Sequence, residues 1–154
     1  MDIKLITVGK VKEEYYRNKL DELKNKFNSG NGCKIKIIEV PDESIPDKQS
    51  EAVLRNIKSK EGARVLSEIE KNDYVVALCI DGKPTDNKKL KELFIKARED
   101  YRSSFVLIIG GSLGLSDEVI NRADYKLSIS DMTFPHQLMR VMLLEIIYDS
   151  LYYC

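Results

Sequence analysis

The sequence predicts an α/β fold in which a mainly parallel β-sheet lies between two layers of helices, as a three-layer sandwich. The first observation is that strand-like and helix-like patterns alternate along the whole chain. The second is a pair of continuous apolar runs, residues 74–80 and 105–109, of the kind that a parallel sheet buries on both faces. Because the 154 residues contain no internal repeat and no long linker, we expect one domain spanning residues 1–154.

The N-terminal half is expected to hold two strands and two helices. Residues 3–8 are apolar and β-branched and end at a glycine, whereas residues 34–40 begin with alternating Lys and Ile, as in a half-buried strand. Apolar residues recur at helical spacing over residues 11–27 and again over residues 49–70. Gly62 interrupts the second of these patterns, which weakens the case for one unbroken helix there.

The C-terminal half is expected to hold three strands and three helices. A turn is predicted at residues 81–84, where Asp, Gly, Lys and Pro follow the first apolar run. Pro135 stands at the start of the last helix, a position where proline is tolerated. The expected strands are residues 74–80, 105–109 and 125–130, and the expected helices are residues 87–101, a short helix from Asp117, and a helix from Pro135 to about Tyr152.

The overall charge is balanced, with 25 Lys and Arg residues against 25 Asp and Glu residues. Proteins that bind nucleic acids nonspecifically usually carry a basic excess, so the composition disfavours that class. It leaves open a local basic patch, or an RNA target that other molecules hold in place.

Cysteine and histidine are too sparse to predict a structural zinc site. Cys33, Cys79 and Cys154 form no Cys-x-x-Cys pair, and His136 is the one histidine of the chain. We therefore expect thiols of a reducing cytosol and no bound metal. The first apolar run is too short for a signal peptide, and no run approaches the length that spans a membrane, so a cytoplasmic protein is expected.

Three loops follow expected strands at corresponding ends: residues 81–83, residues 110–114 (Gly-Gly-Ser-Leu-Gly) and residues 129–136. In parallel α/β sheets, ligands bind beyond the carboxyl ends of the strands, and glycine lets the backbone approach a ligand closely. One pocket is therefore expected where these loops meet, although the glycine segment alone also fits a plain tight turn. The segment is not Gly-x-Gly-x-x-Gly and does not follow the first strand, which disfavours a Rossmann-like oxidoreductase.

The last predicted helix is apolar on nearly every side, which is typical of a buried helix. Its surplus apolar face predicts a dimer interface, and the alternative is a deeply covered helix in a monomer. His136 and Arg140 are four residues apart and share a face of this helix. His136 could contact a cofactor or RNA near the pocket, or serve only as a structural hydrogen-bonding group.

Several segments fall in a recognisable order along nearly the whole chain. They are Ile6-Thr-Val-Gly-Lys10, Ile38-Glu-Val-Pro-Asp42, Lys60-Glu-Gly62, Leu78 with Asp81-Gly-Lys83, Ile108-Ile-Gly-Gly-Ser-Leu-Gly-Leu-Ser116, and Met132-Thr-Phe-Pro-His-Gln-Leu-Met-Arg140. Together they resemble the SPOUT (α/β-knot) methyltransferases that modify N3 of a pseudouridine in large-subunit rRNA. The most specific pieces are the Gly-Gly-x-x-Gly-Leu and Thr-Phe-Pro-His motifs in tandem.

The resemblance implies a trefoil knot in the C-terminal half, a homodimer, and S-adenosyl-L-methionine (SAM) held in the knot loops. Backbone groups are expected to dominate the contacts with adenine. The implied substrate is a pseudouridine in a large-subunit stem-loop of the assembled ribosome, which fits a chain with no net charge. By matching position, the implied SAM contacts are Leu78, Gly110, Ile129, Ser130, Asp131, Met132, Thr133 and Phe134.

The implied reaction moves a methyl group from a sulfonium to an imide nitrogen and needs no metal. The enzyme must align N3 with the methyl group and help to remove the N3 proton. Alignment contributes roughly 7–11 kcal/mol in favourable cases, and a general base adds about 10²–10⁴-fold. His136 is the candidate base, and Arg140 is the candidate to hold a phosphate or to favour the deprotonated imide.

The sequence departs from the family pattern in two places. Family members usually continue into a short basic tail ending in Tyr-His-Lys, whereas this sequence ends at Leu151-Tyr-Tyr-Cys154. Asp131 stands where a basic residue is commoner, which reverses a local charge near the expected RNA path. The alternative to an active enzyme is therefore a catalytically impaired dimer that binds SAM or the ribosome without turnover.

Overall fold

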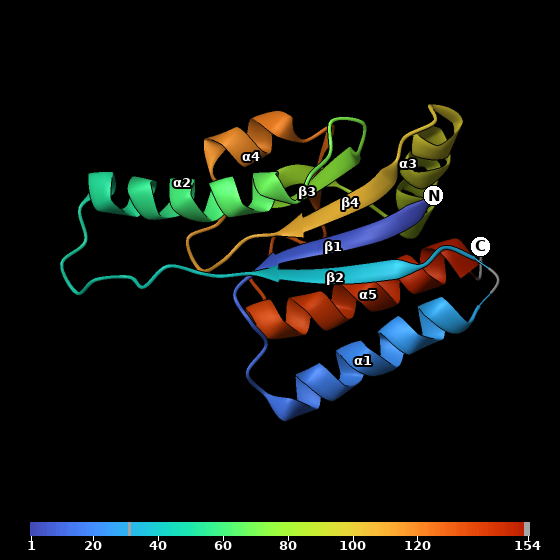
Figure 1. Ribbon diagram of the computed structural model, residues 1–154, viewed down its shortest axis with the longest axis horizontal. Helices are drawn as coiled ribbons and strands as arrows, with labels where there is room; N and C mark the ends of the chain where they lie inside the picture. Colours follow the sequence, from blue (N-terminus) through green and yellow to red (C-terminus); the bar gives the residue numbers. More distant parts are fainter. Residues whose placement is uncertain (31, 153–154) are drawn as a thin grey trace.

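The computed structural model describes residues 1–30 and 32–152 and contains one five-stranded sheet (Figure 1). All paired strands are parallel, in the order β2-β1-β4-β3-β5. The strands are β1 (Asp2–Val8), β2 (Ile35–Val40), β3 (Tyr74–Pro84), β4 (Ser104–Ile109) and β5 (Tyr125–Ser128). The helices are α1 (Glu14–Ser29), α2 (Glu51–Ser67), α3 (Asn87–Glu99), α4 (Asp117–Arg122) and α5 (His136–Tyr152).

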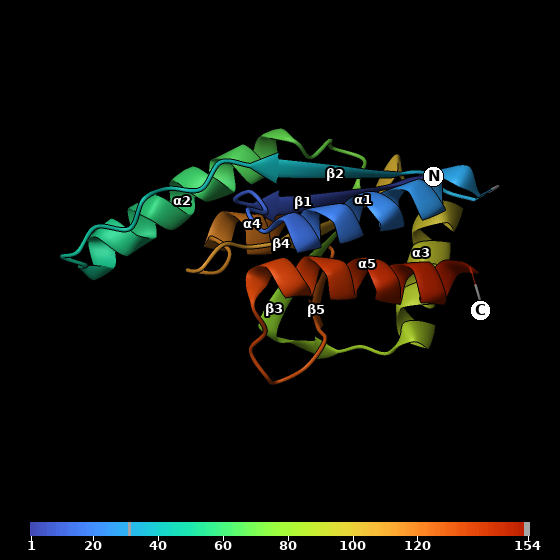
Figure 2. The ribbon, with the colours of Figure 1, turned by 90° about the horizontal axis from the view of Figure 1, so that it is seen from below.

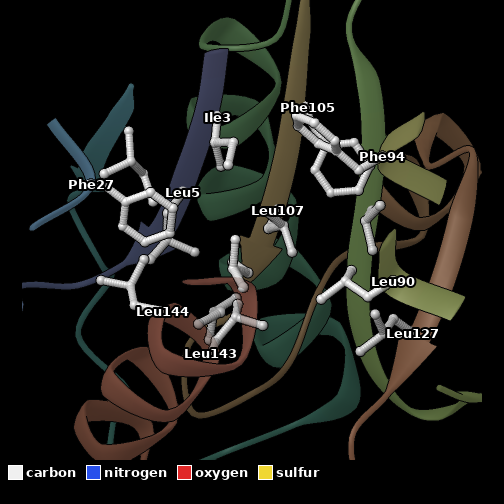
Figure 3. Close-up of a cluster of buried hydrophobic side chains, with 14 of the residues drawn as sticks. Ile3, Leu5, Phe27, Leu90, Phe94, Phe105, Leu107, Leu127, Leu143 and Leu144 are labelled. Atoms are coloured by element: carbon white, nitrogen blue, oxygen red, sulfur yellow. The ribbon is translucent and has the colours of Figure 1, made fainter. Parts of the chain in front are cut away.

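Helices cover both faces of the sheet, which confirms the predicted three-layer α/β architecture. Helices α1, α3 and α5 pack on one face, and α2 and α4 pack on the other (Figures 1 and 2). Figure 3 shows the larger core cluster, where Phe27 of α1, Phe94 of α3 and Leu143 of α5 gather over the central strands.

The central strands show why the sequence forms this sheet. All six residues of β4 are buried, as expected for an apolar run that lies inside a parallel sheet. Successive side chains of a strand point to opposite faces. Leu107 therefore joins the cluster under α5, whereas its neighbour Ile108 joins the cluster under α2 and α4. Strand β2 at the edge keeps only its first and last residues buried, in agreement with the predicted half-buried strand.

The predicted turn at residues 81–84 is wrong, because β3 continues to Pro84. Leu78 and Lys83 both face Leu127 of β5, so the intervening residues leave the ladder and return to it. At Gly82 an added Cβ would lie 2.7 Å from the carbonyl carbon of Leu127, which only glycine avoids. Strand β5 in turn ends at Ser128, so residues 129–130 belong to the following loop rather than to the strand.

Gly62 does not break α2, which runs without interruption from Glu51 to Ser67. An added Cβ at Gly62 would lie 2.2 Å from Oγ of Ser116, the residue that caps α4. Glycine is therefore needed for the close approach of the two helices rather than for a break in one of them. The start of α1 also differs from expectation, because residues 10–13 form a loop and the helix begins at Glu14.

Helix α5 is buried along one side and half-buried along another in this single chain. Leu143, Leu144 and Ile147 are almost fully enclosed against the sheet and its neighbouring helices. Val141 and Met142 remain half-buried. A single chain therefore does not cover every side of this helix, and the predicted dimer interface on its surplus apolar face stays a prediction. Within the described residues, no helix is long and apolar enough to cross a membrane.

Candidate functional site

A cavity of about 390 Å³ lies at the carboxyl ends of the adjacent strands β4, β3 and β5. Its volume is within the usual range of small-molecule sites. Its walls come from the β3 excursion, the loop after β4, the loop after β5 and the first turn of α5. The structure thus brings together the three loops that the sequence placed at corresponding strand ends.

The loop after β4 is a tight glycine turn that forms one wall of the cavity. The amide of Gly114 donates to the carbonyl of Gly111 at 3.0 Å, and Gly114 has a φ of +81°, which favours glycine. An added Cβ at Gly110 would lie 2.8 Å from the carbonyl carbon of Gly114. The tight-turn interpretation and the pocket interpretation of this segment are therefore both correct.

The loop after β5 is ordered by its own serines. Oγ of Ser130 accepts a hydrogen bond from the amide of Met132 at 3.1 Å, and Oγ of Ser128 donates to the carbonyl of Ser130 at 3.3 Å. The carbonyl of Ser128 also accepts the amide of Thr85 at 3.2 Å, which ties this loop to the end of β3. Short polar side chains thus shape a loop that forms part of the cavity wall.

The β3 excursion contributes two ionisable groups to the rim. Burial raises the pKa of the Cys79 thiol, and the nearby Asp81 carboxylate raises it further, so the thiol is protonated at neutral pH. Asp81 itself is exposed at the edge of the cavity. Together with His136 from α5, these are the ionisable side chains among the cavity-lining residues that the structure describes.

Most of the residues expected to contact SAM lie in the cavity wall. His136, the expected base, is also there and is exposed. Asp131 is exposed and is not part of the wall, although both of its neighbours in sequence are. The expected SAM contacts that line the cavity are Leu78, Gly110, Ile129, Ser130, Met132, Thr133 and Phe134.

Arg140 lies away from the cavity wall, in a buried ion pair. Its side chain is 3% exposed, with Nη1 at 3.3 Å from Oε2 of Glu39 and Nη2 donating to the carbonyl of Val8 at 2.9 Å. Burial lowers the pKa of the guanidinium, and Glu39 opposes that shift. The structure therefore does not bring Arg140 together with His136 in the pocket. The Arg140 side chain instead joins α5 to the ends of β1 and β2.

A second buried charge lies behind the glycine turn. Glu61 of α2 is 5% exposed and accepts a hydrogen bond from the amide of Glu43 at 3.1 Å. An added Cβ at Gly111 would lie 3.6 Å from both of its carboxylate oxygens. Burial raises the pKa of the Glu61 carboxyl, the bond from Glu43 lowers it, and the nearby Asp42 raises it.

Sequence reasoning missed several residues of the cavity wall. Gly111 and Ser112 belong to the same glycine segment as Gly110 and also line the cavity. Predicting the whole segment, instead of its first residue alone, would have included them. Met139 lies one helical turn after His136, and that spacing could have indicated it. Ile120 of α4 had no sequence signal, because its place depends on how α4 packs against the sheet.

The composition of the wall limits what the cavity can bind. It is mostly apolar, and none of the residues that form it is Lys or Arg. A dinucleotide or nucleotide needs cations or a helix N-terminus for its phosphates. The start of α5 reaches the wall, but no Lys or Arg side chain there could meet a phosphate, so the mostly apolar cavity better suits a nucleoside-like ligand. In the described part of the chain, no cluster of three or more His, Cys, Asp or Glu residues could hold a metal ion.

Comparisons with known proteins agree with this geometry. Residues 1–152 match the family described as "Predicted SPOUT methyltransferase". The chain is 48% identical over 150 residues to the ribosomal RNA large subunit methyltransferase H of Clostridioides difficile (strain 630), and 49% identical to that of Clostridium novyi (strain NT). Each alignment covers 97% of this chain and 93% of the relative. The chain belongs to the SPOUT methyltransferase family.

Proposed function

We propose that this protein transfers a methyl group from SAM to N3 of a pseudouridine in large-subunit rRNA of the assembled ribosome. The observation that carries the proposal is the mostly apolar cavity, without Lys or Arg in its wall, that is built from the loops after β3, β4 and β5. It is supported by close relatives that are named as methyltransferases of large-subunit ribosomal RNA.

The residues of the cavity fit SAM in size and chemistry. Adenine and ribose are flat or compact groups that apolar walls and backbone amides can hold, and no phosphate has to be neutralised. We propose that Leu78, Gly110 and residues 129–134 hold the adenosine part through their backbone. Bound there, SAM supplies an electrophilic methyl group. No contact with SAM is assigned to the Asp131 side chain, because Asp131 is exposed and does not line the cavity.

We propose that His136 removes the N3 proton of the substrate, because it is the one wall residue whose side chain commonly acts as a base near neutral pH. Arg140 is assigned a different role from the one the sequence indicated. Its buried guanidinium positions the first turn of α5, and with it His136, against β1. Direct contact between Arg140 and a phosphate is not part of the proposal.

The proposal includes a homodimer in the cytoplasm and a trefoil knot formed by the C-terminal segments. The half-buried apolar residues of α5, among them Val141, Met142 and Ile146, support the dimer, because a second chain would cover them. Size-exclusion chromatography with light scattering should give the mass of two chains.

The decisive experiment is methyl transfer from labelled SAM to ribosomes that lack the modification, followed by mass spectrometry of the rRNA. Label at N3 of one large-subunit pseudouridine is expected. A second preparation that carries the family's Tyr-His-Lys tail serves as a comparison. SAM binding without transfer by either preparation would overturn the proposal in favour of a non-catalytic, ribosome-binding dimer.

The role of His136 is tested by His136→Ala in the same assay. Loss of a general base should lower kcat by about 10²–10⁴-fold while SAM affinity is retained. The matched control is Asn87→Ala at the first residue of α3, an exposed polar position at a helix start that does not line the cavity. Unchanged turnover of the His136 variant would show that another group removes the proton.

A further inference from the structure

The loop between β1 and α1, residues 9–13, lies beside the candidate pocket. At its beginning, Val8 packs against the glycine turn, since an added Cβ at Gly111 would lie 3.2 Å from Cγ1 of Val8. At its end, the amide of Glu13 donates to Oε1 of Gln137 at 3.3 Å, next to His136. Figure 1 shows this loop at the same edge of the sheet as the start of α5.

Buried hydrogen bonds hold the backbone of this loop. Gly9 has a φ of +87° and donates to the carbonyl of Val40 at 2.8 Å. The amide of Val11 donates to Oε2 of Glu39 at 2.7 Å, and the carbonyl of Val11 accepts a hydrogen bond from Arg17. The conformation of the loop is therefore set by β2 and α1 as well as by its own sequence.

The ion pair between Glu39 and Arg140 also holds this loop, from the side of α5. Arg140 reaches both Glu39 and the carbonyl of Val8, although burying a guanidinium costs free energy and leaves its Nε without a partner among the described residues. Buried ion pairs contribute little to net stability, and their best-supported use is to specify one conformation. Here that conformation is the arrangement of the β1–α1 loop against the first turn of α5.

This loop presents two lysines and one carboxylate, that of Glu13, to solvent. Gly9 and Val11 are buried, whereas Lys10 and Lys12 alternate with them and are exposed. Neither lysine forms an ion pair with any residue in the described ranges. The Glu39 carboxylate is already bound by Val11, Arg17 and Arg140. Glu13 within the loop and Asp42 beside Gly9 are the other carboxylates here, and neither forms an ion pair with these lysines in the described structure.

We propose that Lys10 and Lys12 bind backbone phosphates of the RNA substrate and so place the target nucleotide at the mouth of the pocket. This inference rests on the proposed function, since it assigns a contact to that substrate. Phosphate contacts fix the register of a protein on a nucleic acid. A loop that is ordered before binding loses less conformational entropy when it makes such contacts. Because the chain carries no net charge, the contact is local rather than a long-range attraction.

The test is the double variant Lys10→Ala/Lys12→Ala compared with Lys34→Ala/Lys36→Ala. Lys34 and Lys36 are also exposed and two residues apart, but they lie at the opposite end of the sheet, where β2 begins. Both variants change the net charge by the same amount. Binding to ribosomes that lack the modification is measured over a range of salt concentrations, together with SAM affinity and the kcat and KM of methyl transfer.

Loss of Lys10 and Lys12 should weaken ribosome binding by roughly tenfold at low salt and reduce the salt slope by roughly 1.5. KM for ribosomes should rise while kcat and SAM affinity stay the same, and the control variant should behave like the unchanged protein. Equal weakening by both variants would show that the effect comes from the change in net charge, and it would overturn the inference. So would an effect that is present with ribosomes but absent with protein-free large-subunit rRNA, since the partner would then be a ribosomal protein.

The two proposals fail in different ways. If the unchanged protein transfers no methyl group but the two double variants still differ in RNA binding, the catalytic proposal fails and the phosphate contact stands. If transfer occurs and the two variants bind alike, the contact is wrong and the function stands.

Discussion

The carboxyl ends of β4, β3 and β5 differ in composition from the amino end of the sheet. At these carboxyl ends, a glycine turn and short polar loops leave a cavity with mostly apolar walls. At the amino end, charged side chains fill the space between the loops. We call that group the amino-end cluster; it consists of Lys4, Glu70, Asp73, Arg102, Arg122 and Asp124.

The side chains of the amino-end cluster hold the surrounding loops in place through hydrogen bonds to their backbone. Asp73 is fully buried, and its Oδ2 accepts from the amide of Glu70 at 2.9 Å and from Nζ of Lys4 at 3.1 Å. Nη2 of Arg122 donates to the carbonyls of Glu70 and Asp73 at 3.0 and 3.1 Å. Asp124 accepts the amide of Val75 at 2.8 Å. Side chains thus satisfy the loop backbone here, and none of the residues of this cluster lines the candidate cavity.

The comparison teaches that stability and binding are assigned to different ends of the same strands. Ligand sites in parallel α/β sheets occur at the carboxyl ends, so residues there are free to be small. The opposite ends have no such role and can carry ion pairs that hold the strands in register. Variants at the two ends should therefore separate unfolding free energy from cofactor affinity.

The largest effect is expected from Asp73→Ala at the amino end. Removing this carboxylate leaves Lys4 and the amide of Glu70 without their partner, which should lower the free energy of unfolding by about 3 kcal/mol. Chemical denaturation measures the loss, and calorimetry should find SAM affinity unchanged. A large fall in SAM affinity in the folded variant would contradict the separation of the two ends.

The next effect is expected from Gly110→Ala at the carboxyl end. The new methyl group would meet the backbone of Gly114 at 2.8 Å, so the turn must shift. SAM affinity, measured by calorimetry, should fall by about tenfold or more, which corresponds to about 1.4 kcal/mol. Gly30→Ala at the end of α1 is the control, because Gly30 has a φ of −82°, which alanine also adopts, and it does not line the cavity. Equal losses for both variants would show that the clash is not the cause.

A smaller effect is expected from Glu61→Gln, which keeps an acceptor for the amide of Glu43 but removes the buried charge. Burial raises the pKa of Glu61 in the folded protein, so the unchanged protein loses stability as pH rises through the usual glutamate range toward the folded-state pKa. The variant lacks that loss, and its advantage should grow from acidic to neutral pH. Denaturation at several pH values measures the difference, and a constant difference would exclude the titration of Glu61 as the cause.

The smallest effect is expected on the rates at which two thiols at opposite ends of the molecule are alkylated. Cys79 lines the cavity, whereas Cys33 lies close to the N-terminus and Asp2. Burial raises the pKa of both thiols, so alkylation should be slow. SAM should slow the alkylation of Cys79 severalfold and leave Cys33 unchanged, as followed by mass spectrometry of peptides. Equal protection of both would point to general stabilisation by SAM. Cys154 is outside the described residues.

Much of the fold follows from local pattern, and the exceptions have physical causes. The apolar run of β4 and the alternation in β2 reflect burial. Such a pattern can be recognised from the residues of one strand alone. Gly62 was misread because its reason is Ser116, which is far along the chain and belongs to another helix. The excursion of β3 was misread as a turn because Asp-Gly-Lys-Pro is typical of both.

The candidate site was predictable as a set of loops but not as a set of side chains. Loops after parallel strands must meet at one edge, and the order β4-β3-β5 then makes the three loops neighbours. Helical spacing puts His136 and Arg140 on one face, yet only His136 lines the cavity. Arg140 instead turns to Glu39, whose position is set by the pairing of β2 with β1.

The sequence by itself determined the elements, the layered α/β class and the loops that carry the site, because burial and turn chemistry are written into neighbouring residues. The tertiary structure alone decided which strands are adjacent, which buried charges meet and which loop is held rigid beside the pocket. Those outcomes depend on contacts between residues that are distant in sequence, such as Val8 with Gly111 and Glu39 with Arg140. No local pattern encodes such a contact, because neither partner reveals the position of the other.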